Sequence, residues 1–93
     1  MITIHIPLSL EQYTWHLQNF FDGMVHKLHL NSHKSTPTKE QMEGIIQLLL
    51  DEVTELRQQL DEDKFNHNSL VETHDIANFA FLAFVALCND GVK

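Results

Sequence analysis

The chain has 93 residues, with 13 Asp and Glu against 6 Lys and Arg, which gives a formal net charge of −7 at pH 7 when His is neutral. This charge excludes a nonspecific nucleic-acid binder, because such a protein needs a basic surface to meet phosphates. The length predicts one domain over residues 1–93, and a chain this short buries only a modest part of its surface when alone. We therefore expect it to self-associate.

Cysteine usage and hydropathy indicate the compartment. Cys88 is the single cysteine, which excludes an intramolecular disulfide and favours a reducing compartment, with Cys88 as a small core residue. The amino terminus lacks the basic and continuous apolar segments of a secretory signal. The apolar run at residues 76–87 is too short to span a bilayer. We expect a cytoplasmic protein with no membrane partner.

The first elements in chain order are a possible strand and a long helix. Residues 2–6, ITIHI, alternate apolar and polar side chains, which fits a short strand or an extended arm. Ser9 and Gln12 then have the spacing of a capping box. Apolar side chains with helical spacing follow, and they predict a helix over residues 10–31.

A second helix is expected after the polar segment NSHKSTPT at residues 31–38. Pro37 with Thr36 or Thr38 supplies a helix start, and the helical pattern continues to about residue 62. One face carries an apolar stripe typical of a packed helix. The stripe consists of Ile45, Leu49, Val53, Leu56 and Leu60.

The third helix follows the charged connection DEDKFNHN at residues 61–68. Ser69 is the predicted N-cap, Cys88 or Asn89 the predicted end, and Gly91 lies just beyond it. Apolar residues cover most of this helix's circumference, so it must be surrounded by its own fold or by another subunit. We predict an all-α fold, a bundle of three main helices completed by homo-oligomerisation.

Carboxylates interrupt the apolar pattern of both later helices. Glu52 lies at the edge of the apolar stripe, Glu55 is one turn further along beside it, and Asp51 points further out. Glu72 and Asp75 repeat the same spacing among apolar neighbours. Two antiparallel helices can bring four such carboxylates together, where they repel one another unless divalent cations neutralise them. An all-oxygen set of ligands suits Mg²⁺ or Mn²⁺ better than zinc.

These residues resemble a known family. The order Asp51-Glu52-x-x-Glu55 and then Glu72-x-x-Asp75, followed by Ile-Ala-Asn-Phe, resembles the EExxE and ExxD motifs of MazG-like all-α nucleoside triphosphate pyrophosphohydrolases. The segment KLHLNSHK at residues 27–34 looks like the one that precedes the acidic helix in short, often phage-encoded, members. The resemblance covers roughly residues 24–87. Asp51 stands where the motif has its first Glu.

The resemblance implies hydrolysis of a nucleoside or deoxynucleoside triphosphate to the monophosphate and pyrophosphate. Glu52, Glu55, Glu72 and Asp75 would be both the metal ligands and the catalytic residues, holding Mg²⁺, with Mn²⁺ as a possible substitute, to activate water. The substrate is expected to meet Lys27, Asn31, Lys34 and Asn78. The first three follow i, i+4, i+7 spacing and suit phosphate, whereas Asn78 suits a metal ligand, the sugar or phosphate.

The same resemblance implies a homodimer or homotetramer, in the host cytoplasm if the gene is phage-encoded. The short chain, typical of phage-encoded members, favours a deoxynucleotide substrate. The nucleotide base, the phosphorus atom that is attacked and the residue that acts as general base stay open. Two other classes remain alternatives: a non-catalytic helical interaction module that uses the third helix, and a metal-binding protein without hydrolase activity.

Simpler interpretations of individual residues also remain. Glu52 and Glu55 could form a solvated helix edge, and Ser69-x-x-Glu72 is itself a capping box. Zinc is suggested by the spacing of three His residues, but surface or phosphate-contacting His is favoured. These are His26, His29 and His33. The aromatic residues Tyr13, Trp15 and Phe20 are interpreted as core rather than as a base-stacking surface.

Overall fold

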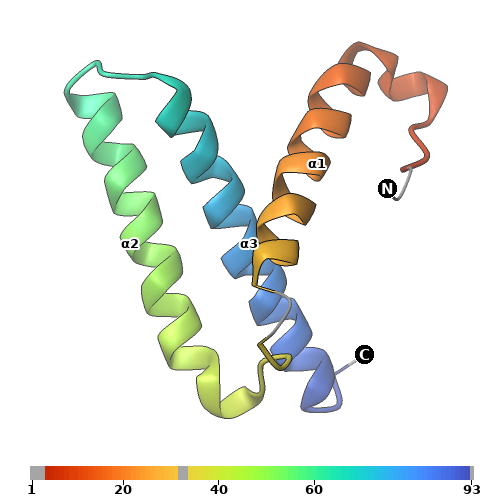
Figure 1. The fold of residues 1–93 in the computed structure, drawn as a ribbon, viewed down its shortest axis with the longest axis vertical. Coiled ribbons are helices and arrows are strands. Elements are labelled where there is room, and N and C mark those ends of the chain that lie inside the picture. Colours follow the sequence, from red (N-terminus) through yellow and green to blue (C-terminus); the bar gives the residue numbers. More distant parts are fainter. Residues whose placement is uncertain (1–3, 32–33, 93) are drawn as a thin grey trace.

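A computed structural model describes residues 4–31 and 34–92 of the chain. This part is helical and contains no strand, which confirms the predicted all-α class (Figure 1). Two short 3₁₀ helices, η1 and η2, lead into the first two α-helices. In chain order the elements are η1 (Leu8–Tyr13), α1 (Thr14–Leu30), η2 (Lys39–Gln41), α2 (Met42–Asp61) and α3 (His67–Asn89).

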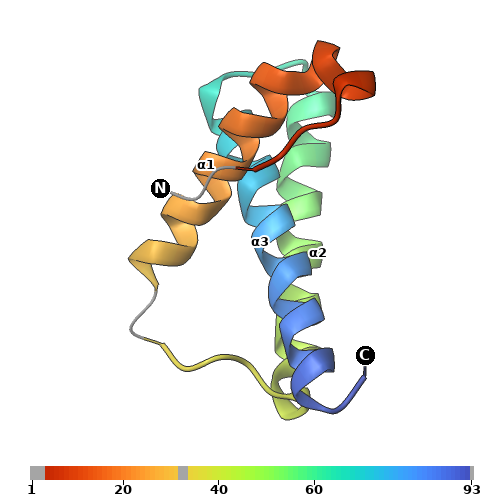
Figure 2. The same cartoon turned by 90° about the vertical axis from the view of Figure 1, so that its right-hand side faces the viewer.

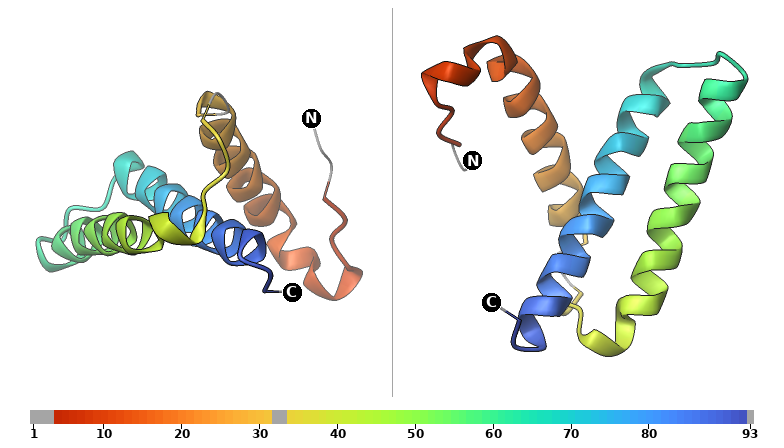
Figure 3. Two further views of the ribbon diagram at one scale, coloured as in Figure 1. Left: turned by 90° about the horizontal axis from the view of Figure 1, so that it is seen from below. Right: turned by 180° about the vertical axis from the view of Figure 1, so that it is seen from behind.

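Helix α3 is the centre of the arrangement. It packs along α2 as an antiparallel neighbour, and α1 crosses it on another side (Figures 1 and 2). Among the described residues, α1 packs on α3 and not on α2. The amino-terminal half of α1 diverges from α3, so the two helices form a V that is also seen from behind (Figure 3). The bundle is therefore an α2–α3 pair with α1 attached to one side.

The start of the first helix differs from the prediction. Pro7 precedes η1 without a side-chain cap, and Leu10 has non-helical angles of φ −112° and ψ 19°. The Ser9–Gln12 capping box is therefore wrong, because a kink separates η1 from the regular helix that begins at Thr14. Residues 4–6 are not a strand, since the described chain offers them no partner strand. Residues 2–3 of the predicted strand lie outside the described part.

The second helix begins and ends as predicted. The backbone N–H of Thr38 donates to Gln41 Oε1 over 2.9 Å, which is one half of a capping box. Pro37 is buried, and its carbonyl accepts a 2.8 Å hydrogen bond from Asn89 Nδ2 at the end of α3. This bond ties the entry of α2 to the far end of its neighbour.

The third helix begins earlier than predicted, and its N-cap is Asn66 rather than Ser69. Asn66 Oδ1 accepts from the N–H of Asn68 over 2.8 Å, and the N–H of Asn66 donates to Ser69 Oγ over 3.0 Å. The Ser69–Glu72 capping box is therefore wrong, and Glu72 lies beyond the first turn.

The end of α3 follows the prediction. Gly91 has φ +92°, a conformation that side chains with a Cβ rarely adopt. In this geometry the N–H of Gly91 donates to Cys88 O over 3.0 Å, and that of Val92 to Leu87 O over 3.1 Å. The two bonds fold the chain back onto carbonyl groups of the last turn and so end the helix.

Few apolar side chains are buried in the single chain. Ile45 and Ala86 are the buried hydrophobic residues of the described part. Phe84 on α3 is 62% exposed, and Trp15 on α1 is 69% exposed. The expectation that Tyr13, Trp15 and Phe20 form core is wrong for the chain alone, because all three are exposed where η1 and the amino-terminal half of α1 diverge from α3.

The total accessible surface measures this openness. It is 7176 Å² for a chain of 10.8 kDa, whereas a compact monomer of that mass exposes about 5,500 Å². The single chain therefore leaves more surface exposed than a compact fold would.

Of the described helices, α3 is the one that is long and apolar enough to cross a membrane, judged by length and composition only.

Replacing Gly23 with Ala should destabilise the fold, although Ala is the better helix former. A Cβ at Gly23 would lie 2.4 Å from His74 Cε1, so the His74 ring must move where α1 crosses α3. We expect a loss of about 1–3 kcal/mol in the free energy of unfolding, measured by urea denaturation. Gly44→Ala is the matched control, since its Cβ would meet nothing within 4 Å, and it should gain about 0.5–1 kcal/mol. Equal gains for both variants would contradict the close α1–α3 crossing.

Candidate functional site

The antiparallel pairing of α2 with α3 brings the four predicted carboxylates into one electrostatic neighbourhood. The pKa of Glu52 is raised above its ordinary value, first by burial and then by the negative charges of Glu55, Asp75 and Glu72. A carboxyl group responds in this way only when the other acids are near enough for their charges to be felt. The charges of the other three acids therefore reach Glu52 across the α2–α3 pair.

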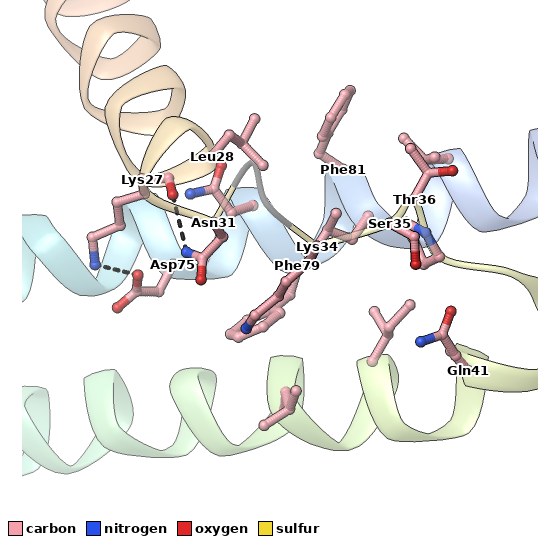
Figure 4. Close-up of a pocket in the computed structure, with 16 residues that line it drawn as sticks. Lys27, Leu28, Asn31, Lys34, Ser35, Thr36, Gln41, Asp75, Phe79 and Phe81 are labelled. Atoms are coloured by element: carbon pink, nitrogen blue, oxygen red, sulfur yellow. Dashed lines mark hydrogen bonds and ion pairs between the residues drawn. The ribbon is translucent and has the colours of Figure 1, made fainter.

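An ion pair joins this cluster to α1. Lys27 Nζ contacts Asp75 Oδ1, and the two side chains are 30% and 26% exposed (Figure 4). Lys27 also acts beyond this pair, because its charge lowers the pKa of Glu52 against the dominant raising effects. The cation lies in the last turn of α1 and the carboxylate near the middle of α3.

Glu72 has one satisfied oxygen and one unsatisfied oxygen. Its Oε1 accepts a 2.8 Å hydrogen bond from Gln59 Nε2 on α2. Ser69 Oγ donates to Gln59 Oε1, which orients the amide so that its nitrogen faces Glu72. Glu72 Oε2 is buried and has no hydrogen-bond partner in the described chain. A buried carboxylate oxygen without a donor or cation is costly, so this atom is available to a ligand.

Glu55 and Asp51 lie further out on α2, and both are exposed. Asp51 Oδ1 accepts a 2.9 Å hydrogen bond from Gln47 Nε2 one turn earlier. Its charge is not among those that raise the pKa of Glu52, whereas the charge of Glu55 is. The geometry thus groups Glu55 with the cluster and leaves Asp51 facing solvent.

A cleft of about 930 Å³ adjoins the cluster at Asp75. It lies between the end of α1, the connection to α2, and the packed α2–α3 pair (Figure 4). All four predicted substrate-contacting residues line it, together with Ser35, Thr36 and Gln41, which were not predicted. The predicted set is Lys27, Asn31, Lys34 and Asn78. Of the four acids, Asp75 alone lines the cleft, and the other three lie beside it.

The i, i+4, i+7 spacing of Lys27, Asn31 and Lys34 does not form one helical stripe, because α1 ends at Leu30. Asn31 caps this end, and its Nδ2 donates to the Lys27 carbonyl over 3.1 Å. The N–H of Lys34 donates to the Asn31 carbonyl over 3.1 Å. Both side chains nevertheless face the same cleft as Lys27. Ser35 and Thr36 also line the cleft, and the polar composition of residues 31–38 is the sequence feature that could have indicated them.

Asn78 is the buried polar residue of the cleft wall. Its side chain is 8% exposed, and its Oδ1 is buried without a hydrogen-bond partner in the described chain. Apolar side chains surround it along the cleft, including Phe79 and Leu82. An unpaired amide in apolar surroundings costs free energy that a hydrogen bond to a ligand would recover.

The described side chains do not form a ready metal site in this arrangement. Within residues 4–31 and 34–92, no three His, Cys, Asp or Glu side chains are placed to share one ion. Asp75 is engaged by Lys27, and Glu72 by Gln59. The donor chemistry still fits Mg²⁺ or Mn²⁺, because the set is all carboxylate and Glu72 Oε2 is buried and unpaired. Of the three histidines that suggest zinc, His26 and His29 are exposed, and His33 lies outside the described residues.

Comparisons with protein-family models, with curated proteins and with solved structures find no match to this chain. The functional interpretation therefore depends on the geometry of the acids and the cleft.

Replacing Glu52 with Gln should stabilise the metal-free protein at neutral pH. Because the folded-state pKa of Glu52 is raised, its favourable contribution is complete below the ordinary value of 4.5 and is lost as the pH rises through the raised pKa. Gln is neutral at every pH, so the variant should be more stable than the wild type at pH 7, with the difference vanishing towards pH 4. Urea unfolding with a chelator present measures this.

Asp51→Asn is the control, since Asp51 is exposed and does not influence the pKa of Glu52. A comparable gain from Asp51→Asn would mean that general charge reduction, rather than the cluster, explains the effect.

Proposed function

We propose that this protein is a MazG-like pyrophosphohydrolase that cleaves a nucleoside or deoxynucleoside triphosphate to the monophosphate and pyrophosphate with Mg²⁺. The observation that carries the proposal is a cleft that Asp75 lines together with basic and amide side chains, next to acids of α2 and α3 whose charges reach Glu52. Carboxylates attract divalent cations, and lysines attract phosphates. A metal-bound triphosphate needs both kinds of group side by side.

The carboxylates would hold the ions, with Glu52, Glu55, Glu72 and Asp75 as the ligands and Mn²⁺ as a possible substitute for Mg²⁺. A bound divalent ion supplies Lewis acidity and lowers the pKa of a coordinated water. Glu72 contributes a buried oxygen that lacks a partner. The pKa of Glu52 is raised first by burial and then by the charges of Glu55, Asp75 and Glu72, and a cation would relieve the second of these influences.

The cleft would bind the substrate. Lys27 and Lys34 supply positive charge for phosphates, and Asn31 adds an amide at the same end. Asn78 lies among apolar side chains and suits the nucleoside part, since its unpaired Oδ1 accepts hydrogen bonds. A volume of about 930 Å³ is within the range of small-molecule sites. A deoxynucleoside triphosphate is the favoured substrate class, and nothing in the lining selects a base.

We further propose that the chain works as a homodimer or homotetramer. It exposes about 1,600 Å² more than a compact monomer of its mass. A standard protein interface covers about 800 Å² of each partner, so the excess is enough for a stable assembly. Phe81, Phe84 and Leu87 on α3 are 40%, 62% and 43% exposed and form a natural part of such an interface. The net charge of −7 suits a cytoplasmic protein without nucleic-acid or membrane partners.

An interaction module without catalysis is the second candidate, because the exposed apolar faces of all three helices also suit a partner protein. A metal-binding protein without hydrolase activity is the third. The three differ in whether divalent ions raise the melting temperature and whether pyrophosphate is released. An interaction module shows neither effect, and a metal-binding protein shows the first alone.

A pyrophosphate-release screen tests the hydrolase proposal. The wild type is incubated with the common and noncanonical NTPs and dNTPs in Mg²⁺ or Mn²⁺, and at least one should be cleaved. Glu52→Gln and Asp75→Asn should lower kcat/KM by at least roughly 100-fold, or about 2.7 kcal/mol. Asp61→Asn is the control, because Asp61 pairs with Arg57 on the exposed surface and should keep full activity. Wild-type rates in both cluster variants would overturn the catalytic assignment.

Self-association is tested by light scattering coupled to gel filtration. Replacing Phe84 with Asp places a charge on the exposed apolar face of α3, which should shift the protein to a smaller species. Leu8→Asp is the matched control, because Leu8 is 81% exposed on η1, which packs on α1 rather than on α3. A monomeric wild type, or equal shifts in both variants, would contradict an interface on α3.

A further inference from the structure

We propose that Lys27 is an exchangeable counterion of the carboxylate cluster. In the metal-free protein its ammonium group neutralises Asp75, and binding of a divalent cation at the cluster releases it into the cleft, where it meets the phosphates. This inference rests on the proposed function and assigns Lys27 two successive partners instead of one.

The position of Lys27 allows both partners. Its ammonium group contacts Asp75 Oδ1, and the same side chain lines the cleft with Asn31 and Lys34 (Figure 4). Both members of the ion pair are partly exposed, at 30% and 26%, so neither is locked by packing. A flexible lysine stem needs only rotation about its own bonds to turn from the carboxylate towards the cleft.

No other described cation neutralises the cluster. Arg57 pairs with Asp61, Lys64 with Glu62 and Lys39 with Asp90, all of them away from the four acids. Apart from Lys27, the remaining described Lys or Arg residue is Lys34, which is exposed at the cleft. Lys27 is also the cation whose charge reaches Glu52. The cluster without metal therefore depends on this one ammonium group.

The neighbouring His74 is engaged by another contact. Its ring packs against Phe20, with ring centroids 5.2 Å apart, and so serves the α1–α3 contact. Among the described residues, Lys27 is the cation that forms an ion pair with Asp75.

Competition follows from this geometry. An ammonium group and a divalent ion on the same carboxylate repel each other, so the ion must displace Lys27 or bind more weakly beside it. Removing the ammonium group should strengthen divalent binding, and the released Lys27 would join Lys34 as a second charge for phosphate. A purely structural ion pair would have no such effect on ion affinity.

Mn²⁺ titration of the full chain, followed by the electron paramagnetic resonance signal of free Mn²⁺, tests the exchange without any substrate. Lys27→Met keeps the aliphatic stem and loses the charge, and it should bind Mn²⁺ about tenfold more tightly than the wild type, or about 1.4 kcal/mol. Lys27→Arg should bind more weakly, because a guanidinium group holds Asp75 through two hydrogen bonds. Lys39→Met is the matched control and should stay within about twofold of the wild type, since Lys39 pairs with Asp90 and its exposed charge is strongly screened.

The ordering Lys27→Met, wild type, Lys27→Arg, from tightest to weakest, supports the exchange. Equal or weaker binding by Lys27→Met overturns it, even when pyrophosphate release is normal. The expected ordering without pyrophosphate release leaves the exchange standing and removes the hydrolase function. Absence of Mn²⁺ binding in every variant removes both the exchange and the metal assignment. If Lys27→Met is less stable than the wild type without metal, affinity is compared through melting temperatures instead. Tighter Mn²⁺ binding should then raise the melting temperature of Lys27→Met by more than that of the wild type.

Discussion

The ion pair between Lys27 and Asp75 is the interaction on which this arrangement depends. Burial and the charges of three other carboxylates raise the pKa of Glu52, and the ammonium group of Lys27 is the cation that counters them. The Lys27–Asp75 pair also attaches α1 to α3, in addition to the close approach of Gly23 to His74, while the amino-terminal half of α1 diverges. One ion pair thus serves both charge balance and helix packing, which links the position of α1 to the state of the cluster.

The polar bridge between α2 and α3 explains why the acids share one side of the pair. Ser69 orients Gln59, and Gln59 holds one oxygen of Glu72. A shift of one residue between the helices would rotate the acids by about 100° away from each other. The bridge therefore selects a register, and apolar contacts alone select it weakly because the stripe on α2 is only partly covered. The same register leaves the second oxygen of Glu72 buried without a hydrogen-bond partner among the described residues, which costs stability.

Periodicity predicted the three α-helices and the side on which the acids lie, because both follow from local spacing. Capping was harder, since Asn66-x-x-Ser69 and Ser69-x-x-Glu72 match the same pattern and only the extended backbone of Asn66 decides between them. The Lys27–Asp75 pair, 48 residues apart, follows from the crossing of α1 and α3, which no local spacing encodes. Asn31 and Lys34 line the cleft although α1 ends at Leu30, so their i, i+4, i+7 spacing with Lys27 indicated the right residues without a continuous helix.

Assembly and charge are coupled through burial. The exposed apolar side chains of α3 lie on the same helix as Glu72 and Asp75. A second copy on this helix would remove water from around the cluster, and desolvation is already the largest influence that raises the pKa of Glu52. Lower local dielectric strengthens repulsion among the acids and their attraction to cations alike. Association would therefore make the cluster more dependent on positive charge, so that the proposed oligomer would hold the proposed divalent ion more tightly than the single chain would.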